Sequence, residues 1–501
     1  MNFVRGVEPR NPTQDLVKPV VEEIRLNKQH HLPNTFLLQY DAMLRPDFQD
    51  LFHREKDDQM ELGVWIEIVR PLVEAVGIEW RGRPGYDWDW YVNPGFLMAY
   101  TQQQREQLID ELMRKFKELF GEYPRSVGSW LLDSYSMDYM SRKYAIDAFA
   151  ICREQFAIDA YTLWGGYFNQ GYYPSKVNML CPASTAEMQI STPVFRMLGP
   201  DPIYGYDEKA ELYPQTHPSC NTLEPVWFTG HDPQAVNWML DCHFHQECLN
   251  FAYAQLGQEN SFGWDSIQKG LPMQLSLVAQ MAAAGEVVVE QLGDTGRWFR
   301  RTFASTPATS LIAASDREKN GLQTVWYDCK HYRASLLLQN GRLGFRDIHL
   351  FDEHYAERYY ETPCTGWQAT YDNLPVVDGR LWSTPEIHAM LALEPAVQSI
   401  STARTGENEL TVTALLTNGQ PLRIEFRESG ITIISESAHS WHFRRGQHFD
   451  TDLTVTAHAL RMHHNGFDYQ IPVVGALCSH GADEYTIVPQ NGKIALDMEQ
   501  K

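Results

Sequence analysis

Short apolar runs that each end in a carboxylate are the feature of this sequence that most restricts its fold. TFLLQYDAM carries Asp41, LGVWIEI carries Glu67, SVGSWLLDSY carries Asp133 and FAYAQLGQENSFGW carries Glu259. Runs of this kind are typical of strands that are buried on both faces, as in a parallel sheet. In barrels of parallel strands, catalytic groups lie where the strands end and the loops begin. We therefore expect these acids to face one cavity at the carboxyl ends of the strands.

Strand patterns alternate with helix patterns up to about residue 285. The clearest helix follows Thr101, which forms a capping box with Gln104, and it stops at Gly121. Asp232 and Pro233 mark the start of another helix. The expected strands include 35–41, 62–68, 127–133 and 251–259, and the expected helices include 16–27, 137–144 and 273–284. Such alternation favours a parallel sheet, which we expect to close into a (β/α) barrel.

The pattern changes after about residue 290 to short strands separated by turns. Asn340-Gly341 and Asn418-Gly419 are strong signals for hairpin turns. This texture predicts an antiparallel β-domain of the sandwich type. A chain of 501 residues is also too long for one ordinary core. We therefore predict two domains, a barrel over 1–290 and an accessory β-sandwich over 291–501.

The charge balance restricts the partners. The chain has 42 Lys and Arg against 64 Asp and Glu, a formal net charge of −22, which repels nucleic acids and anionic membranes. No stretch reaches the roughly 18 apolar residues that span a membrane. The N-terminus has no apolar signal region, so we expect a cytoplasmic protein, or a periplasmic or secreted one whose signal was removed. The oligomeric state stays open.

Cysteine and histidine spacing gives no sign of a metal or cofactor. The eight cysteines are scattered without a C-x-x-C pair, and we expect free, buried thiols. DCHFHQEC places Cys242, His243, His245 and Cys248 on an expected helix, where residues two apart do not share a face. Phosphate-binding, H-E-x-x-H and G-x-S-x-G motifs are not found. We predict no metal and no cofactor.

Each acid also has a structural interpretation. Asp41 could cap the following turn, Glu67 could pair with Arg70, and Asp133 could cap the helix that follows it. Glu259 is the strongest candidate, because QENSFGW combines an acid, an amide, a hydroxyl and an aromatic at one strand end. Glu224 and Asp201 lie on loop-like segments from which either could enter a cleft.

Aromatic residues accompany these acids. PGYDWDWY and TLWGGYFNQGYYPS lack helix or strand periodicity, and their Gly and Pro residues mark them as loops. Aromatics on loops over a barrel mouth suit stacking against sugar rings, and packing of loop on loop is the alternative. The aromatic residues that we predict to bind substrate are Trp65, Trp88, Trp90, Trp130, Trp164, Tyr167 and Trp264.

With these segments considered together, residues 1 to about 290 resemble the NodB-type barrel superfamily. TFLLQYDAM resembles its first motif, MELGVWIEI its H-E-I-G-x-H region and PRSVGSWLLDSY its R-x-P-x-G motif. This resemblance implies a distorted seven-stranded (β/α) barrel, as in polysaccharide deacetylases and in family-38 and family-57 glycosidases. LPNTFLLQYDAM, GSWLLDSY, LWGGYFNQGYYPSK and VFRMLGPDPIYGYD are similar, more narrowly, to an uncharacterised family common in gut Bacteroidetes.

The departures from the superfamily pattern shape the functional prediction. Where deacetylases carry two metal-binding histidines in the second motif, this chain has Glu61 and Trp65 or Glu67, and only Asp41 matches the first-strand metal motif of the mannosidases. We therefore favour a metal-independent glycoside hydrolase that acts on an oligosaccharide or polysaccharide with two carboxyl groups. The pair is drawn from Asp41, Glu67, Asp133 and Glu259, with Asp133 and Glu259 first. The alternatives are a carbohydrate esterase with a metal site built on Asp41, and a catalytically silent glycan-binding barrel.

Overall fold

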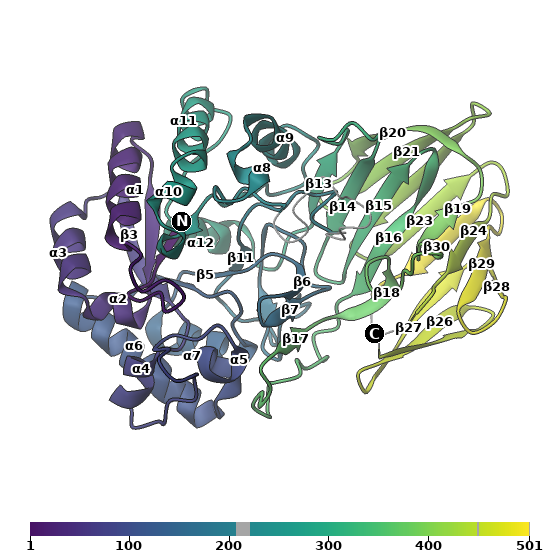
Figure 1. The fold of residues 1–501 in the computed structure, drawn as a ribbon. Coiled ribbons are helices and arrows are strands. Elements are labelled where there is room, and N and C mark those ends of the chain that lie inside the picture. The colour runs from purple at the N-terminus through teal and green to yellow at the C-terminus, as the bar shows by residue number, and fades with distance from the viewer. Residues whose placement is uncertain (207–220, 448–449, 500–501) are drawn as a thin grey trace.

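The computed structural model describes residues 1–206, 221–447 and 450–499, with a helix-rich half and a β-rich half (Figure 1). The helix-rich half is built on a curled, eight-stranded sheet. Its strand order is β12 (Gln258–Glu259), β1 (Asn2–Val4), β2 (Asn34–Leu38), β3 (Met60–Trp65), β4 (Ser126–Gly128), β5 (Ala148–Ile151), β11 (Val194–Arg196) and β8 (Gly171–Tyr172). Neighbours from β12 to β11 run parallel, and β8 is antiparallel to β11. All of the parallel strands therefore end at the same edge.

Helices connect these strands and pack around the sheet (Figure 1). They are α1 (Val17–His30), α2 (Tyr40–Leu44), α3 (Pro46–Glu55), α4 (Arg70–Ala75), α5 (Val92–Gly95), α6 (Gln102–Phe120), α7 (Ser134–Tyr144), α8 (Phe228–His231), α9 (Pro233–Phe244), α10 (Trp264–Ile267), α11 (Gly270–Ala283) and α12 (Leu292–Thr302), with the 3₁₀ turns η1 (Leu97–Ala99) and η2 (Asn260–Phe262). Thr101 and Gln104 form the predicted capping box, and Gly121 ends α6 with φ of 85°. The Asp232 side chain caps α9.

The strand predicted over 251–259 is mostly wrong. Only Gln258 and Glu259 form a strand, which pairs at the sheet edge with Asn2 and Phe3. The preceding residues lack secondary structure, because their aromatic side chains pack among other rings instead of joining the sheet. Phe251, for example, contacts Trp298 on α12 with ring centres 5.2 Å apart.

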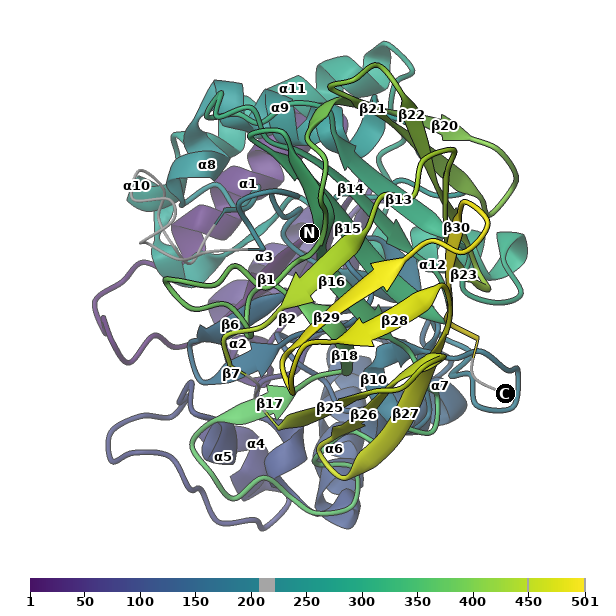
Figure 2. The ribbon, with the colours of Figure 1, turned by 90° about the vertical axis from the view of Figure 1, so that its right-hand side faces the viewer.

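The β-rich half contains two large antiparallel sheets (Figure 2). The first comprises β13 (Thr309–Ala313), β14 (Gln323–Asp328), β15 (Tyr332–Gln339), β16 (Arg342–Leu350), β18 (Leu374–Asp378), β19 (Leu391–Leu393), β24 (Trp441–Arg444), β28 (Ala476–Ser479) and β29 (Glu484–Val488). The second comprises β20 (Val397–Arg404), β21 (Leu410–Leu416), β22 (Pro421–Arg427), β23 (Gly430–Ser435), β25 (Thr451–Val455), β26 (Ala459–His464), β27 (Phe467–Val474) and β30 (Lys493–Asp497). Side chains of both sheets share one apolar core.

Several sequence predictions about architecture are confirmed. The chain is α/β, with a parallel sheet and helices first and antiparallel sheets afterwards. Asn340 and Gly341 form the turn between β15 and β16 with φ of 51° and 78°, values that suit Asn and Gly. The edge strands β12 and β8 of the first sheet are not paired with each other in the described residues, so this sheet is open. The seven-strand barrel and the sandwich stay predictions.

The two halves are joined by strand pairing and by a shared core. β17 (Ala369–Tyr371) pairs in parallel with β7 (Tyr161–Leu163), which also pairs with β6 (Gln155–Ile158). A separate small ladder joins β9 (Pro174–Ser175) and β10 (Asn178–Pro182). Phe168 of the first half and Trp326 of the second stack with ring centres 3.7 Å apart. The division into domains at residue 290 stays a prediction.

The cysteines and the helices bear on two further expectations. All the described cysteines are free, and five of them are buried, whereas Cys248 is half-buried and Cys478 is exposed. Cys220 lies outside the described residues. No helix in the described ranges has both the length and the apolar character needed to cross a membrane.

Candidate active site

A cavity of about 460 Å³ lies where the parallel strands end. Arg5 follows β1, Glu67 follows β3, Trp130 follows β4 and Cys152 follows β5, while Glu259 is the last residue of β12. Because these strands are parallel, their carboxyl ends bring residues that are distant in sequence to one edge. Leu198, Thr222, Glu224 and Trp227, which lie between β11 and α8, also line it. The carboxylates that line the cavity are Glu67, Asp159, Glu224 and Glu259, beside Arg5, Arg10 and Arg153.

Arg5 holds two of these carboxylates together. Its Nη2 atom lies 3.0 Å from Oε2 of Glu259 and 3.1 Å from Oε2 of Glu67. The guanidinium carbon lies 3.7 Å from the ring centre of Trp88. All of these side chains are buried, and a buried charge is tolerated where opposite charges and hydrogen bonds compensate its desolvation. Arg5 therefore fixes both glutamates on one side of the cavity.

Burial and Arg5 oppose each other in setting the pKa values of Glu67 and Glu259. Burial raises the pKa of Glu67 to about 6, although Arg5 and a 2.9 Å hydrogen bond from Nε1 of Trp65 favour its ionised form. Burial also raises the pKa of Glu259, and the Arg5 charge acts against that rise. Both glutamates are therefore harder to ionise than a glutamate in water.

Glu224 enters the cavity from the loop before α8. Its Oε2 atom accepts a 2.6 Å hydrogen bond from Nε1 of Trp227. Burial, with the negative charge of Glu259 as the next cause, raises the pKa of Glu224 to about 8. Glu224 is therefore protonated at neutral pH, whereas Glu67 and Glu259 share the positive charge of Arg5. One cavity therefore contains a carboxyl group that favours the protonated form and two carboxyl groups that contact a positive charge.

Aromatic rings form much of the rest of the lining. They are Trp88, Trp90, Phe96, Trp130, Tyr161, Trp227 and Phe262. Trp88, Trp90 and Trp130 were among the predicted substrate-binding residues, and they reach this cavity. Trp65 lies behind the lining, where it stacks on Phe3 with ring centres 4.0 Å apart and donates to Glu67.

Other predicted aromatic residues lie elsewhere. Trp164 is buried at the junction of the halves and donates a 2.8 Å hydrogen bond to Asp378. The Tyr167 hydroxyl is buried and donates to the carbonyl of Pro307. Trp264 begins α10 and packs against α1 and α11 side chains. Trp164 and Tyr167 thus pack against residues of the β-rich half, and Trp264 packs against helices, away from the cavity.

Asp133 and Asp41 do not line the cavity. Asp133 is the N-cap of α7, where it accepts from the Ser136 backbone at 3.0 Å, and it is paired with Arg105. Asp41 follows β2 in the first turn of α2 and accepts from the Ala42 backbone; burial raises its pKa to about 6. The structure thus brings together Glu67 and Glu259 of the four predicted acids.

The cavity also contains residues that sequence reasoning missed or ranked low. Arg5 follows a strand of only three residues, too short to show a period. From the sequence, Glu224 was considered only as a loop residue that could enter a cleft. Its position in the cavity depends on tertiary contacts that the local sequence does not reveal. Asp201, considered with it, instead caps a buried turn through Ile203 and pairs with Arg317 at 2.8 Å.

The residues of the cavity do not fit a metal ion. No histidine is found among its described lining residues, and the position between Glu67 and Glu259 is taken by the Arg5 guanidinium. A second cation there would be repelled by Arg5. Among the residues that the structure describes, no group of three His, Cys, Asp or Glu side chains is placed to hold a metal.

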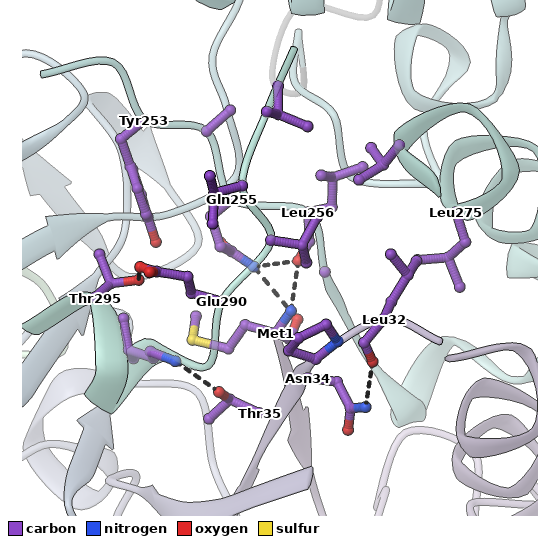
Figure 3. A pocket seen from close by; sticks show the side chains of 18 of the residues that line it. Met1, Leu32, Asn34, Thr35, Tyr253, Gln255, Leu256, Leu275, Glu290 and Thr295 are labelled. Atoms are coloured by element: carbon purple, nitrogen blue, oxygen red, sulfur yellow. Dashed lines mark hydrogen bonds between the residues drawn. The ribbon is translucent and has the colours of Figure 1, made fainter. Parts of the chain in front are cut away.

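A second cavity, of about 500 Å³, opens at the other end of the strands (Figure 3). Met1, Asn34 and Thr35 line it at the amino ends of β1 and β2, together with Leu32 from the turn after α1 and Leu275 of α11. Its walls are mainly apolar, and its described lining includes the acids Glu23, Glu286 and Glu290 but no arginine. The cavity at the carboxyl ends of the strands is therefore the better candidate for chemistry.

Comparisons with known proteins show what the chain resembles. No protein-family model matches the chain, and no curated protein matches it. A Parabacteroides distasonis protein described as a candidate glycoside hydrolase/deacetylase has 16% identity and a TM-score of 0.50, over 72% of this chain and 82% of that one. A candidate polysaccharide deacetylase from Mycobacterium smegmatis has 10% identity and a TM-score of 0.37, over 60% of this chain and 89% of that one. The resemblance to this group of folds, which the sequence motifs indicated, is confirmed at the level of fold.

Proposed function

We propose that the protein is a carbohydrate-active hydrolase that cleaves glycosidic bonds with paired carboxyl groups and without a metal. The observation that carries the proposal is that buried Glu224 lines the same aromatic-rich cavity as the Arg5-bound carboxylates of Glu67 and Glu259. Glycoside hydrolysis requires one carboxyl group that is protonated and another that is ionised. The fold similarity to a candidate glycoside hydrolase/deacetylase agrees with this class.

Each carboxyl group has a role in this proposal. Glu224 gives its proton to the leaving oxygen of the glycosidic bond, as its raised pKa allows. Glu259 is the nucleophile, or the base that activates water, because Arg5 stabilises its ionised form. Glu67 shares Arg5 and adds negative charge that stabilises the positive charge developing on the sugar ring. Asp133 and Asp41 are not part of this set.

Deacetylation is the second candidate, named because the similar Parabacteroides distasonis protein is described with both activities. The described residues around Arg5 include carboxyl groups but no histidine that could bind a metal. They therefore fit metal-free glycosidase chemistry better than metal-dependent deacetylation. A glycan-binding protein without activity would share the aromatic lining, but it would have no need for a glutamate held protonated.

Activity on aryl glycosides and on acetylated sugars, with and without chelator, tests the proposal. We expect chelator-insensitive release of the aryl group and no release of acetate. Glu224→Gln and Glu259→Gln should each lower kcat by about 10²–10⁴-fold. Asp265→Asn, an exposed acid on α10, is the control and should leave kcat unchanged. Chelator-sensitive acetate release, or full activity in both glutamine variants, would overturn the assignment.

A further inference from the structure

A row of aromatic rings leads out of the cavity onto the protein surface. Trp90 lines the cavity, and its ring stacks on Tyr91 with centres 5.6 Å apart. Tyr91 in turn meets Trp367, from the second half of the chain, with centres 4.9 Å apart. We call Trp90, Tyr91 and Trp367 the aromatic row. Trp367 is 50% exposed, whereas tryptophan residues in proteins are highly buried on average.

The backbone on both sides holds this row in place. Val92 donates a 3.0 Å hydrogen bond to the carbonyl of Trp367, and Cys364 donates one of 2.8 Å to the carbonyl of Met98. The segment that carries Trp367 is thereby tied to α5 and η1. These backbone hydrogen bonds consequently hold Trp367 in its exposed position.

Arg83 supports the rings from within the same loop. Its guanidinium carbon lies 4.0 Å from the ring centre of Trp90 and 4.9 Å from that of Tyr91. Two 2.9 Å hydrogen bonds to the buried carboxylate of Asp89 fix the guanidinium. Rings that are already ordered lose little conformational entropy when a ligand lies on them. The row is therefore preformed: Arg83 holds Trp90 and Tyr91, and the Trp367 ring stands nearly perpendicular to Tyr91, at 76°.

We infer that the aromatic row is a subsite for an oligosaccharide chain, whose further units lie on Tyr91 and Trp367 while one linkage occupies the cavity. This inference rests on the proposed function and extends it, since it names a chain and not a single sugar as the substrate. Sugar rings present C–H groups on their faces, and these are attracted to the electron-rich faces of aromatic rings. A cavity of 460 Å³ is at the small end of ligand sites, so a longer chain must continue outside it. Because Trp90 lines the cavity and stacks on Tyr91, the sugar chain would leave the cavity past Trp90 toward Trp367.

The experiment uses the full-length protein and a ladder of xylan-, mannan- and pectin-derived oligosaccharides, from disaccharide to hexasaccharide. Trp367→Ala should raise KM for the longest substrates about threefold to tenfold, the loss of one aromatic contact, and should leave kcat and the disaccharide KM unchanged. Trp367→Phe should restore most of the lost affinity. Tyr123→Ala, which removes a ring that is 39% exposed just beyond the carboxyl end of α6, is the matched control.

The dissociation constants of the same oligosaccharides, measured by calorimetry, separate this inference from the proposed function. If the wild type hydrolyses no substrate but binds long chains more tightly than short ones, and Trp367→Ala removes that difference, the proposed function fails and the subsite stands. Equal effects of Trp367→Ala at every chain length, or none at any length, would overturn the subsite. So would a change in oligomeric state of Trp367→Ala without loss of long-chain affinity, because it would identify the row as a protein contact.

Discussion

Nη1 of Arg105 donates a 2.8 Å hydrogen bond to Oδ1 of Asp133, and both side chains are fully buried. Arg105 also donates to the carbonyls of Tyr100 and Tyr359, so this pair ties α6 and α7 to a segment of the second half. The same carboxylate caps α7. The Asp133 carboxylate thus makes contacts that stabilise the fold.

Substitution of Asp133 should therefore affect stability more than catalysis. Asp133→Ala leaves Arg105 as an uncompensated buried charge and removes a helix cap, and we expect unfolding to become easier by about 3–5 kcal/mol. Asp133→Asn keeps an oxygen for the cap and should cost less, with kcat near that of the wild type. Asp138→Ala, which breaks an exposed pair with Arg142, should change stability by at most about 0.5 kcal/mol. Urea denaturation measures all three variants; a stable Asp133→Asn protein without activity would return Asp133 to the catalytic set.

The pH dependence of kcat/KM should be bell-shaped. Glu224 must be protonated, so activity should fall as pH rises through about 8. Glu259 must be ionised, so activity should also fall on the acid side, at a pH above the ordinary glutamic acid pKa of 4.5. Glu224→Gln should remove the alkaline limb from whatever activity remains. A profile whose alkaline limb is unchanged in Glu224→Gln would contradict the role of Glu224.

Arg5 should set the position of the acid limb. Arg5→Gln removes the charge that favours ionised Glu67 and Glu259, so the acid limb should move upward by about one pH unit. Arg5→Lys keeps the charge, and its limb should stay near that of the wild type although kcat falls. The two profiles are compared over the pH range in which both variants remain folded, as judged by circular dichroism. An unmoved limb in Arg5→Gln would show that Arg5 does not control these carboxylates.

Glu23 should make stability depend on pH. Burial raises its pKa to about 8 from 4.5, and Nε2 of Gln258 donates to it at 3.3 Å. Between those values the unfolded chain releases this proton and the folded protein retains it, so the contribution of Glu23 to stability is lost as pH rises. Glu23→Gln cannot ionise, and its stability relative to the wild type should increase from pH 4.5 to pH 8 and then level off. Chemical denaturation across this range measures the difference; a constant difference would contradict it.

Much of the fold follows from local patterns. The capping box at Thr101, the Asp232-Pro233 helix start and the Asn340-Gly341 turn are set by hydrogen bonds among near neighbours, and each lies where the sequence predicts. Strand 251–259 was predicted from apolar content, which does not distinguish a strand from a coil whose aromatic rings pack in a core.

The site was less predictable, because a carboxylate at a strand end can serve two purposes. Asp133 and Glu67 have similar local sequences, yet Asp133 meets Arg105 and Glu67 meets Arg5, partners that lie in distant parts of the chain. Asp133 caps a helix and Glu67 lines the cavity because of these tertiary contacts, which the local sequence does not show. Glu224 was harder still, since the sequence next to it, 221–227, has no helix or strand period from which its direction could be inferred.

The parallel pairing of β7 with β17 limits how this chain can be cut. A fragment that ended at residue 290 would lose the strand partner of Tyr161–Leu163. It would also lose Glu357, whose carboxylate accepts hydrogen bonds from the backbones of Ser134 and Met179. Those buried donors would be left without acceptors, at a cost of about 1–3 kcal/mol each. We therefore expect a fragment that ends at residue 290 to be less stable than one that also keeps residues 357–371, which supply these contacts.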